Sequence, residues 1–161
     1  MPIGCRYIAD SMFDIKQLSG KFGTDTIWSK TRSITNNVAS QIYAHKCGFN
    51  WLYRLQPANG EQVGHSLSAF ISEFGAPNHL TYDGSAVQVG MNTSFIDMVR
   101  RAEIDYHVSA PRIPNENPAE GSIREVKRRF YQVMLKNRVT KSLLGFGLAW
   151  ICEIGNVTIN S

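Results

Sequence analysis

The chain has 161 residues, of which 43% are apolar and 19% charged, a composition that fits a folded globular protein and excludes a disordered one. No apolar run approaches the roughly 18 residues of a membrane span, and the first residues lack the apolar core of a signal peptide. We therefore expect a single intracellular domain over residues 1–161, which is neither secreted nor membrane-bound, and whose net charge of +4 suits an acidic partner.

The first third of the chain predicts short strands that follow one another closely. The apolar run 6–10 ends in Asp10, and the Gly-, Ser- and Thr-rich stretch 14–33 is typical of an extended loop or a weak hairpin. Further strands are expected within 33–44 and over 49–55. Because the connections between these strands are short, they predict a three-stranded antiparallel meander.

The rest of the chain predicts an alternation of helix and strand. Helices are expected over 65–74, 93–104, 118–137 and 141–154, and strands over 79–83 and 106–110. Asn117 and Pro118 suit the cap and the first position of the third helix. The pattern predicts an α/β fold, a five-stranded mixed sheet flanked by helices, with core motifs over 6–138 and a trailing helical segment over 141–154.

Three carboxylates occupy positions from which they could converge on one edge of such a sheet. Asp10 and Asp83 each end a predicted strand, and Glu120 lies near the start of the helix 118–137. Carboxylate oxygens are hard ligands suited to Mg²⁺ or Mn²⁺, with water and substrate phosphates completing the shell. These residues are therefore candidate ligands of a metal site, although an Asp at a strand end is more commonly a turn or cap residue.

The third acid requires a choice between Glu120 and Glu125. In a helical projection Glu120 lies on the rim of the apolar stripe, whereas Glu125 lies toward solvent beside Arg128 and Arg129, which favours Glu120. Glu120 also has the spacing of a capping box with Asn117, and Glu125 has that of an i, i+4 ion pair. The projection leaves both alternatives open.

The order and spacing of these motifs resemble the integrase core of copia-type long-terminal-repeat retrotransposons. The resemblance rests on Tyr82-Asp83-Gly84, on Tyr106 to Pro111, and on the Pro-rich segment Pro114 to Glu120 with the basic helix that follows it. Asp83 and Glu120 enclose 36 residues, close to the family's spacing, and Ile8 to Phe13 is similar to the family's first catalytic strand. The family's Asn-Gly before the Glu is Asn117-Pro118 here, one residue shorter, which keeps Glu125 as an alternative.

The resemblance, which covers roughly residues 6–154, implies an RNase H-like fold and a DDE-type enzyme. Asp10, Asp83 and Glu120 would hold two Mg²⁺ (or Mn²⁺) ions, and the reactions would be 3′-end processing of the element's DNA and strand transfer into target DNA. The implied partners are DNA and further copies of the same chain. The implied place of action is the nucleus or a virus-like particle.

The helix 118–137 and its N-terminal loop supply the candidate DNA contacts. Six basic residues against two acidic ones between Glu120 and Arg138 give this stretch a local charge of +4. Arg124, Lys127 and Arg128 are candidates for phosphate contacts that position DNA without specifying its sequence. Asn117 is a further candidate, with a plain helix cap as its alternative.

Two other functions fit the same sequence. One is a different RNase H-like nuclease or transposase, with the same site and another substrate. The other is a decayed or domesticated core that binds nucleic acid or a partner without catalysis. The sequence also leaves open whether the chain is a fragment of a polyprotein.

Overall fold

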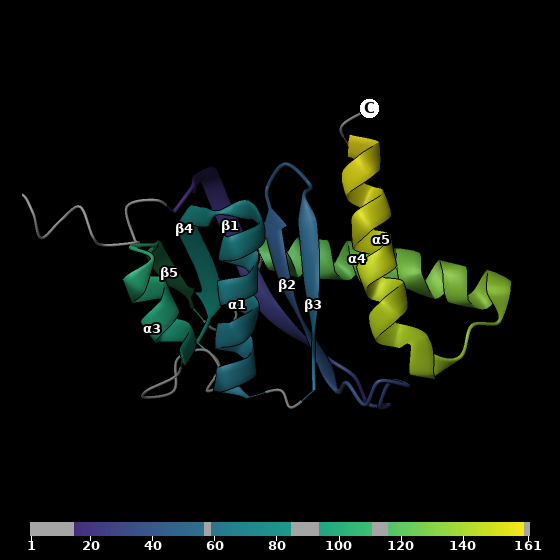
Figure 1. Cartoon of the computed structure of the whole chain (residues 1–161). Coiled ribbons are helices and arrows are strands. Elements are labelled where there is room, and N and C mark those ends of the chain that lie inside the picture. The colour runs from purple at the N-terminus through teal and green to yellow at the C-terminus, as the bar shows by residue number, and fades with distance from the viewer. Residues whose placement is uncertain (1–14, 57–58, 85–93, 111–115, 160–161) are drawn as a thin grey trace, which may run out of the picture.

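A five-stranded mixed sheet forms the centre of the computed structural model, which describes residues 15–56, 59–84, 94–110 and 116–159 (Figure 1). In chain order the strands are β1 (Gln17–Trp28), β2 (Ala39–His45), β3 (Asn50–Leu55), β4 (Ala76–Asp83) and β5 (Asp105–Ser109). They lie in the order β3-β2-β1-β4-β5. The first three form an antiparallel meander, while β4 pairs parallel with β1 and β5 parallel with β4. The predicted five-stranded mixed α/β sheet is confirmed.

Helices cover both faces of the sheet. They are α1 (Gly60–Phe74), α3 (Ser94–Arg101), α4 (Pro118–Asn137), the short 3₁₀ helix η3 (Lys141–Leu143) and α5 (Leu144–Ile159). In Figure 1, α1 lies in front of the sheet and α4 crosses behind it. None of the described helices is both long and apolar enough to cross a membrane.

Alternation along the strands divides the core into two layers, because successive side chains point to opposite faces of a sheet. In β1, Phe22 packs with Phe70 of α1 in one cluster, whereas Ile27 packs with Val126 of α4 in the other. Odd-numbered residues of β1 therefore face the layer formed by α4 and α5. This parity decides which side chains of β1 can reach α4.

The first strand of the described sheet lies in a segment for which the sequence predicted no regular strand. Residues 14–33 were expected to form an extended loop or a weak hairpin, and that expectation is wrong, because 17–28 is the twelve-residue strand β1 at the centre of the sheet. Gly20 and Gly23 suggest a loop when only local preferences are considered. The strand expected over 6–10, with Asp10 at its end, lies outside the described residues.

The predicted helix over 118–137 is confirmed at both ends. Asn117 is its N-cap and Pro118 occupies the first turn. The helix expected over 65–74 begins earlier, at Gly60, because the side chain of Asn59 accepts a hydrogen bond from the backbone N–H of Gln62. It ends as predicted before Gly75, whose φ of 118° few other residues adopt.

Candidate active site

Two carboxylates follow each other across the neighbouring parallel strands β1 and β4. Asp83 is the last residue of β4, whereas Asp25 lies within β1, which continues to Trp28. The pairing of β1 with β4 runs through Gly23 with Thr81 and Thr24 with Tyr82, so Asp25 and Asp83 come next on the two strands. Neighbouring strands are about 4.8 Å apart, and residues in register on parallel strands point to the same face. Since Asp25 has the parity of Ile27, this is the face covered by α4.

Glu120 comes to the same place from the first turn of α4. That turn packs directly on β1, since a Cβ added to Gly23 would lie 2.7 Å from the backbone nitrogen of Ala119 and 2.9 Å from Cδ of Pro118. Asp25 lies two residues farther along the same face of the strand. The start of α4 therefore brings Glu120 to the part of β1 that carries Asp25.

Asp25 lies within the electrostatic reach of both other carboxylates. Burial raises the pKa of Asp25 most, and the charges of Asp83 and Glu120 raise it further. The backbone N–H of Thr26, which donates to Oδ1 at 2.7 Å, and the ammonium of Lys127 lower it. Asp25 is thus a half-buried carboxylate within the electrostatic reach of two like charges and one cation.

Asp25 is the residue that sequence reasoning missed. The first acid was assigned to Asp10, which lies outside the described residues, so that assignment stays a prediction. A signal for Asp25 was present, because Phe22 and Ile27 bracket it in a run with Thr24 and Thr26, residue types that favour strands. The polar, Gly-, Ser- and Thr-rich composition of residues 14–33 predicts a loop instead.

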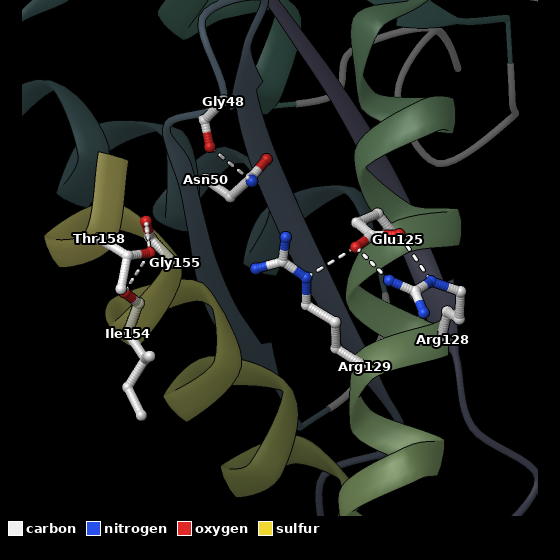
Figure 2. Close-up of polar contacts among 8 residues, drawn as sticks. All are labelled: Gly48, Asn50, Glu125, Arg128, Arg129, Ile154, Gly155 and Thr158. Carbon is white, nitrogen blue, oxygen red and sulfur yellow. Dashed lines mark hydrogen bonds and ion pairs between the residues drawn. The ribbon is translucent and has the colours of Figure 1, made fainter. Parts of the chain in front are cut away.

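The two alternatives for the third acid occupy different environments. Glu125 lies in the second turn of α4 and binds Arg128 through two hydrogen bonds, of 2.8 and 2.7 Å, and Arg129 through one of 2.7 Å (Figure 2). The bonds from Arg128, followed by that from Arg129, lower the pKa of Glu125 to about 2. Glu125 therefore forms the local ion pairs that its spacing predicted, whereas the charge of Glu120 acts on Asp25.

The predicted DNA-contacting residues of α4 also differ in their environments. Arg124 is exposed, and Lys127 is half-buried beside Asp25. Arg128 is held by Glu125, and at 56% exposure its side chain remains open to solvent. Arg124 and Lys127 follow Glu120 by four and seven residues and so lie on its face of the helix.

Asn117 forms the helix cap that the sequence predicts as the alternative to a DNA contact. It is 2% exposed, and its Oδ1 accepts a hydrogen bond of 3.0 Å from the backbone N–H of Ala119. Its Nδ2 donates to the backbone carbonyl of Thr24 at 3.0 Å. Both polar ends of the side chain are therefore occupied within the protein.

The donor set suits a hard divalent cation. Asp25, Asp83 and Glu120 supply carboxylate oxygens, and a cation would relieve the mutual repulsion that raises the pKa of Asp25. Within the described residues no three acidic, histidine or cysteine side chains are gathered closely enough to hold one ion by themselves. Magnesium is commonly held by one or two carboxylates together with water and substrate phosphates, so each ion could be shared between two of these residues and the substrate.

A solved structure shares this architecture. The crystal structure of the catalytic core domain of BIV integrase matches 89% of this chain and 85% of its own, with a TM-score of 0.61 and 15% sequence identity. The chain has the RNase H-like fold of an integrase catalytic core. At this identity the likeness establishes the fold of the chain and leaves its reaction to be tested. The predicted fold class is thereby confirmed.

The sequence itself matches no family model and no curated protein. The copia-type resemblance therefore rests on the sequence motifs alone.

Proposed function

We propose that the chain is the catalytic core of a copia-type retrotransposon integrase, in which Asp25, Asp83 and Glu120 hold two Mg²⁺ or Mn²⁺ ions. The observation that carries the proposal is the register of β1 and β4. It sets Asp25 and Asp83 on neighbouring strands, on the face where the first turn of α4 brings Glu120. In this proposal Asp25 takes the role that the sequence suggested for Asp10.

The reactions are hydrolysis near the 3′ end of the element's DNA and attack of the freed 3′-hydroxyl on a phosphodiester of target DNA. The chemistry supplied by a bound pair of divalent cations is activation of the attacking oxygen and stabilisation of the leaving oxygen in an in-line displacement. The three carboxylates would hold these cations and, through them, set the position of the scissile phosphate. No side chain needs to form a covalent bond to DNA.

The cationic side of α4 binds the DNA backbone. Arg124 and Lys127 lie on the helix face of Glu120, so a phosphodiester chain at the carboxylates passes beside both side chains. Lys127 is near enough to Asp25 to lower its pKa, which places a positive charge next to the proposed reaction centre. Because two DNA ends must be joined to one target, we propose that the chain acts as a homo-oligomer, in the nucleus or in a virus-like particle.

Strand transfer with Mg²⁺ or Mn²⁺ tests the assignment. Asp25→Asn, Asp83→Asn and Glu120→Gln should each lower activity on a pre-processed DNA end by at least about a hundred-fold, because each removes a ligand charge. Glu125→Gln, a matched change on the same helix, should retain activity. Activity that survives Asp83→Asn would contradict the metal site.

A pair of variants tests whether Asp10 or Asp25 is the first acid of the proposed site. Asp10→Asn should leave strand transfer unchanged and Asp25→Asn should abolish it. The opposite result would restore the assignment made from the sequence. DNA binding by a native chain that neither cuts nor joins DNA would favour a decayed or domesticated core, and cutting without joining would favour another RNase H-like nuclease.

A further inference from the structure

We infer that Asn117 is a positioning residue that fixes the distance between Asp25 and Glu120 by tying the start of α4 to the backbone of β1. The inference rests on the proposed function, because it concerns how two of the proposed ligands are held together. Its evidence is a chain of hydrogen bonds and one close backbone contact. Neither depends on a metal ion being bound.

The hydrogen bonds join the two acids through a single residue. Nδ2 of Asn117 donates to the backbone carbonyl of Thr24, the residue that precedes Asp25, at 3.0 Å. The backbone carbonyl of Asn117 accepts the N–H of Glu120 at 3.1 Å. Two successive hydrogen bonds therefore connect the strand that carries Asp25 with the helical turn that carries Glu120.

The amide side chain is suited to this position because it both donates and accepts. Its Oδ1 caps α4 through the N–H of Ala119, while its Nδ2 reaches the strand. Ser, Thr and Asp are also favoured N-caps, but a carboxylate cannot donate and a hydroxyl is shorter. Asn117 is 2% exposed, so loss of the bond to Thr24 would leave a buried polar group without a hydrogen-bond partner.

Gly23 forms the other side of the same contact. A Cβ at this position would lie 2.7 Å from the nitrogen of Ala119 and would also overlap Oδ1 of Asn117. The absence of a side chain at Gly23 thus allows the first turn of α4 to rest on the strand backbone. Gly23 and Asn117 together set how closely Glu120 approaches the sheet edge.

The first test is Asn117→Ser, which keeps an N-cap oxygen and removes the donor to Thr24. Its matched control is Asn59→Ser at the cap of α1, where the asparagine side chain accepts from Gln62 and the helix lies on the opposite face of the sheet. We expect backbone amides 119–124 to exchange hydrogen faster in Asn117→Ser, with amides 60–65 unchanged in Asn59→Ser. Unchanged exchange at 119–124 would overturn the inference.

The second test measures Mn²⁺ binding by the free chain, using the electron paramagnetic resonance of unbound Mn²⁺. Asn117→Ser should weaken binding roughly ten-fold or more, the range seen when residues that orient metal ligands are changed, whereas Asn59→Ser should bind as the native chain does. Faster exchange with unchanged Mn²⁺ affinity would show a purely structural cap and overturn the positioning role.

A pair of glycine variants tests the contact between Gly23 and the start of α4. Gly23→Ala should weaken Mn²⁺ binding as Asn117→Ser does, because the added methyl group displaces the start of α4. Gly121→Ala, whose Cβ would have nothing within 4 Å, should leave Mn²⁺ binding unchanged. Equal Mn²⁺ affinity in both variants would contradict the contact. If the native chain binds no Mn²⁺ either alone or with a DNA end present, the proposed function fails and the tie between Asn117 and β1 is decided by hydrogen exchange alone.

Discussion

The carboxylate of Asp25 combines partial burial with two like charges nearby, and both raise its pKa. A carboxyl whose pKa is higher in the folded chain than in the unfolded chain binds protons more tightly when folded. Its ionisation therefore costs stability, and the cost is fully present only above the raised folded value. Strongly perturbed carboxyl groups cluster at functional sites, which fits the proposed role of Asp25 as a metal ligand.

Asp25→Asn should therefore stabilise the metal-free chain while abolishing strand transfer. The gain in unfolding free energy should be present at pH 7 and vanish below the ordinary value of 3.8, where Asp25 is protonated in both states. Urea unfolding at a series of pH values without divalent cations measures it. A loss of stability at pH 7 would contradict the repulsion described for this site.

Glu125 represents the opposite case, because its pKa is lowered to about 2 by hydrogen bonds from Arg128 and then Arg129. Its contribution to stability should be present above the ordinary value of 4.5 and be lost as the pH falls toward 2. At pH 7, Glu125→Gln should cost roughly 0.5–1 kcal/mol of unfolding free energy, since both pairs are exposed. Urea unfolding at pH 7 and in 1 M salt measures this cost, which salt should reduce.

At the scale of the element, α4 combines the proposed catalytic acid, the proposed DNA contacts and a large part of one core layer. Val126 and Phe130 pack toward the sheet and α5, while Glu120 and Lys127 lie at the carboxylate site. The helix ends at Arg138, an exposed residue in the left-handed conformation with φ of 52° and ψ of 38°. That conformation is costly for residues with a side chain and suits glycine.

Arg138→Gly should raise the unfolding free energy by about 0.5–1 kcal/mol, since glycine adopts positive φ without the clash of a Cβ. Thermal unfolding compared with Arg138→Ala, which keeps the Cβ, separates the backbone effect from loss of the charge. Equal stability of the two variants would contradict the explanation.

Phe130 is 2% exposed and belongs to the core layer shared by α4, α5 and the sheet. Phe130→Ala should lower the unfolding free energy by about 3–5 kcal/mol, because it leaves a cavity between the helices. Urea denaturation measures this, with Tyr131→Ala as the exposed neighbour, for which we expect a much smaller loss. Comparable losses would show that α5 does not pack as described.

At the scale of the whole molecule, the location of the basic residues matters more for DNA binding than the net charge of +4. The basic residues of α4 begin next to the carboxylates and continue along a helix of 20 residues, about 30 Å long. A DNA backbone bound at the carboxylates would therefore lie closest to the basic residues in the first half of α4. Contacts near Glu120 should dominate binding over those in the last turn.

Lys127→Ala should weaken DNA binding uniformly across sequences and reduce the slope of log affinity against log salt by about one. Lys136→Ala removes the same charge from the last turn of the same helix and should change the slope less. Fluorescence anisotropy over a salt series provides both slopes. Equal changes would place the DNA elsewhere than across the carboxylate site.

The sequence by itself determined the α/β class, the strands β2 to β5, the helix that begins at Pro118, and Asp83 and Glu120 as candidate acids. These features are encoded locally, in apolar periodicity, turn residues and helix caps. Glu120 was separated from Glu125 only in part, because a helical projection gives the face of a side chain and not what lies opposite it.

The tertiary structure decided the first strand and with it Asp25. Gly20 and Gly23 weaken a strand by local preference, but β1 is paired on both sides, with β2 and with β4. Gly23 is explained only by the start of α4, 94 residues farther along the chain at Asn117, which packs where a side chain would otherwise lie. Non-local pairing and close contact of this kind leave no periodic pattern in the sequence, so only the folded chain shows that Asp25 lies on a central strand next to the one that carries Asp83.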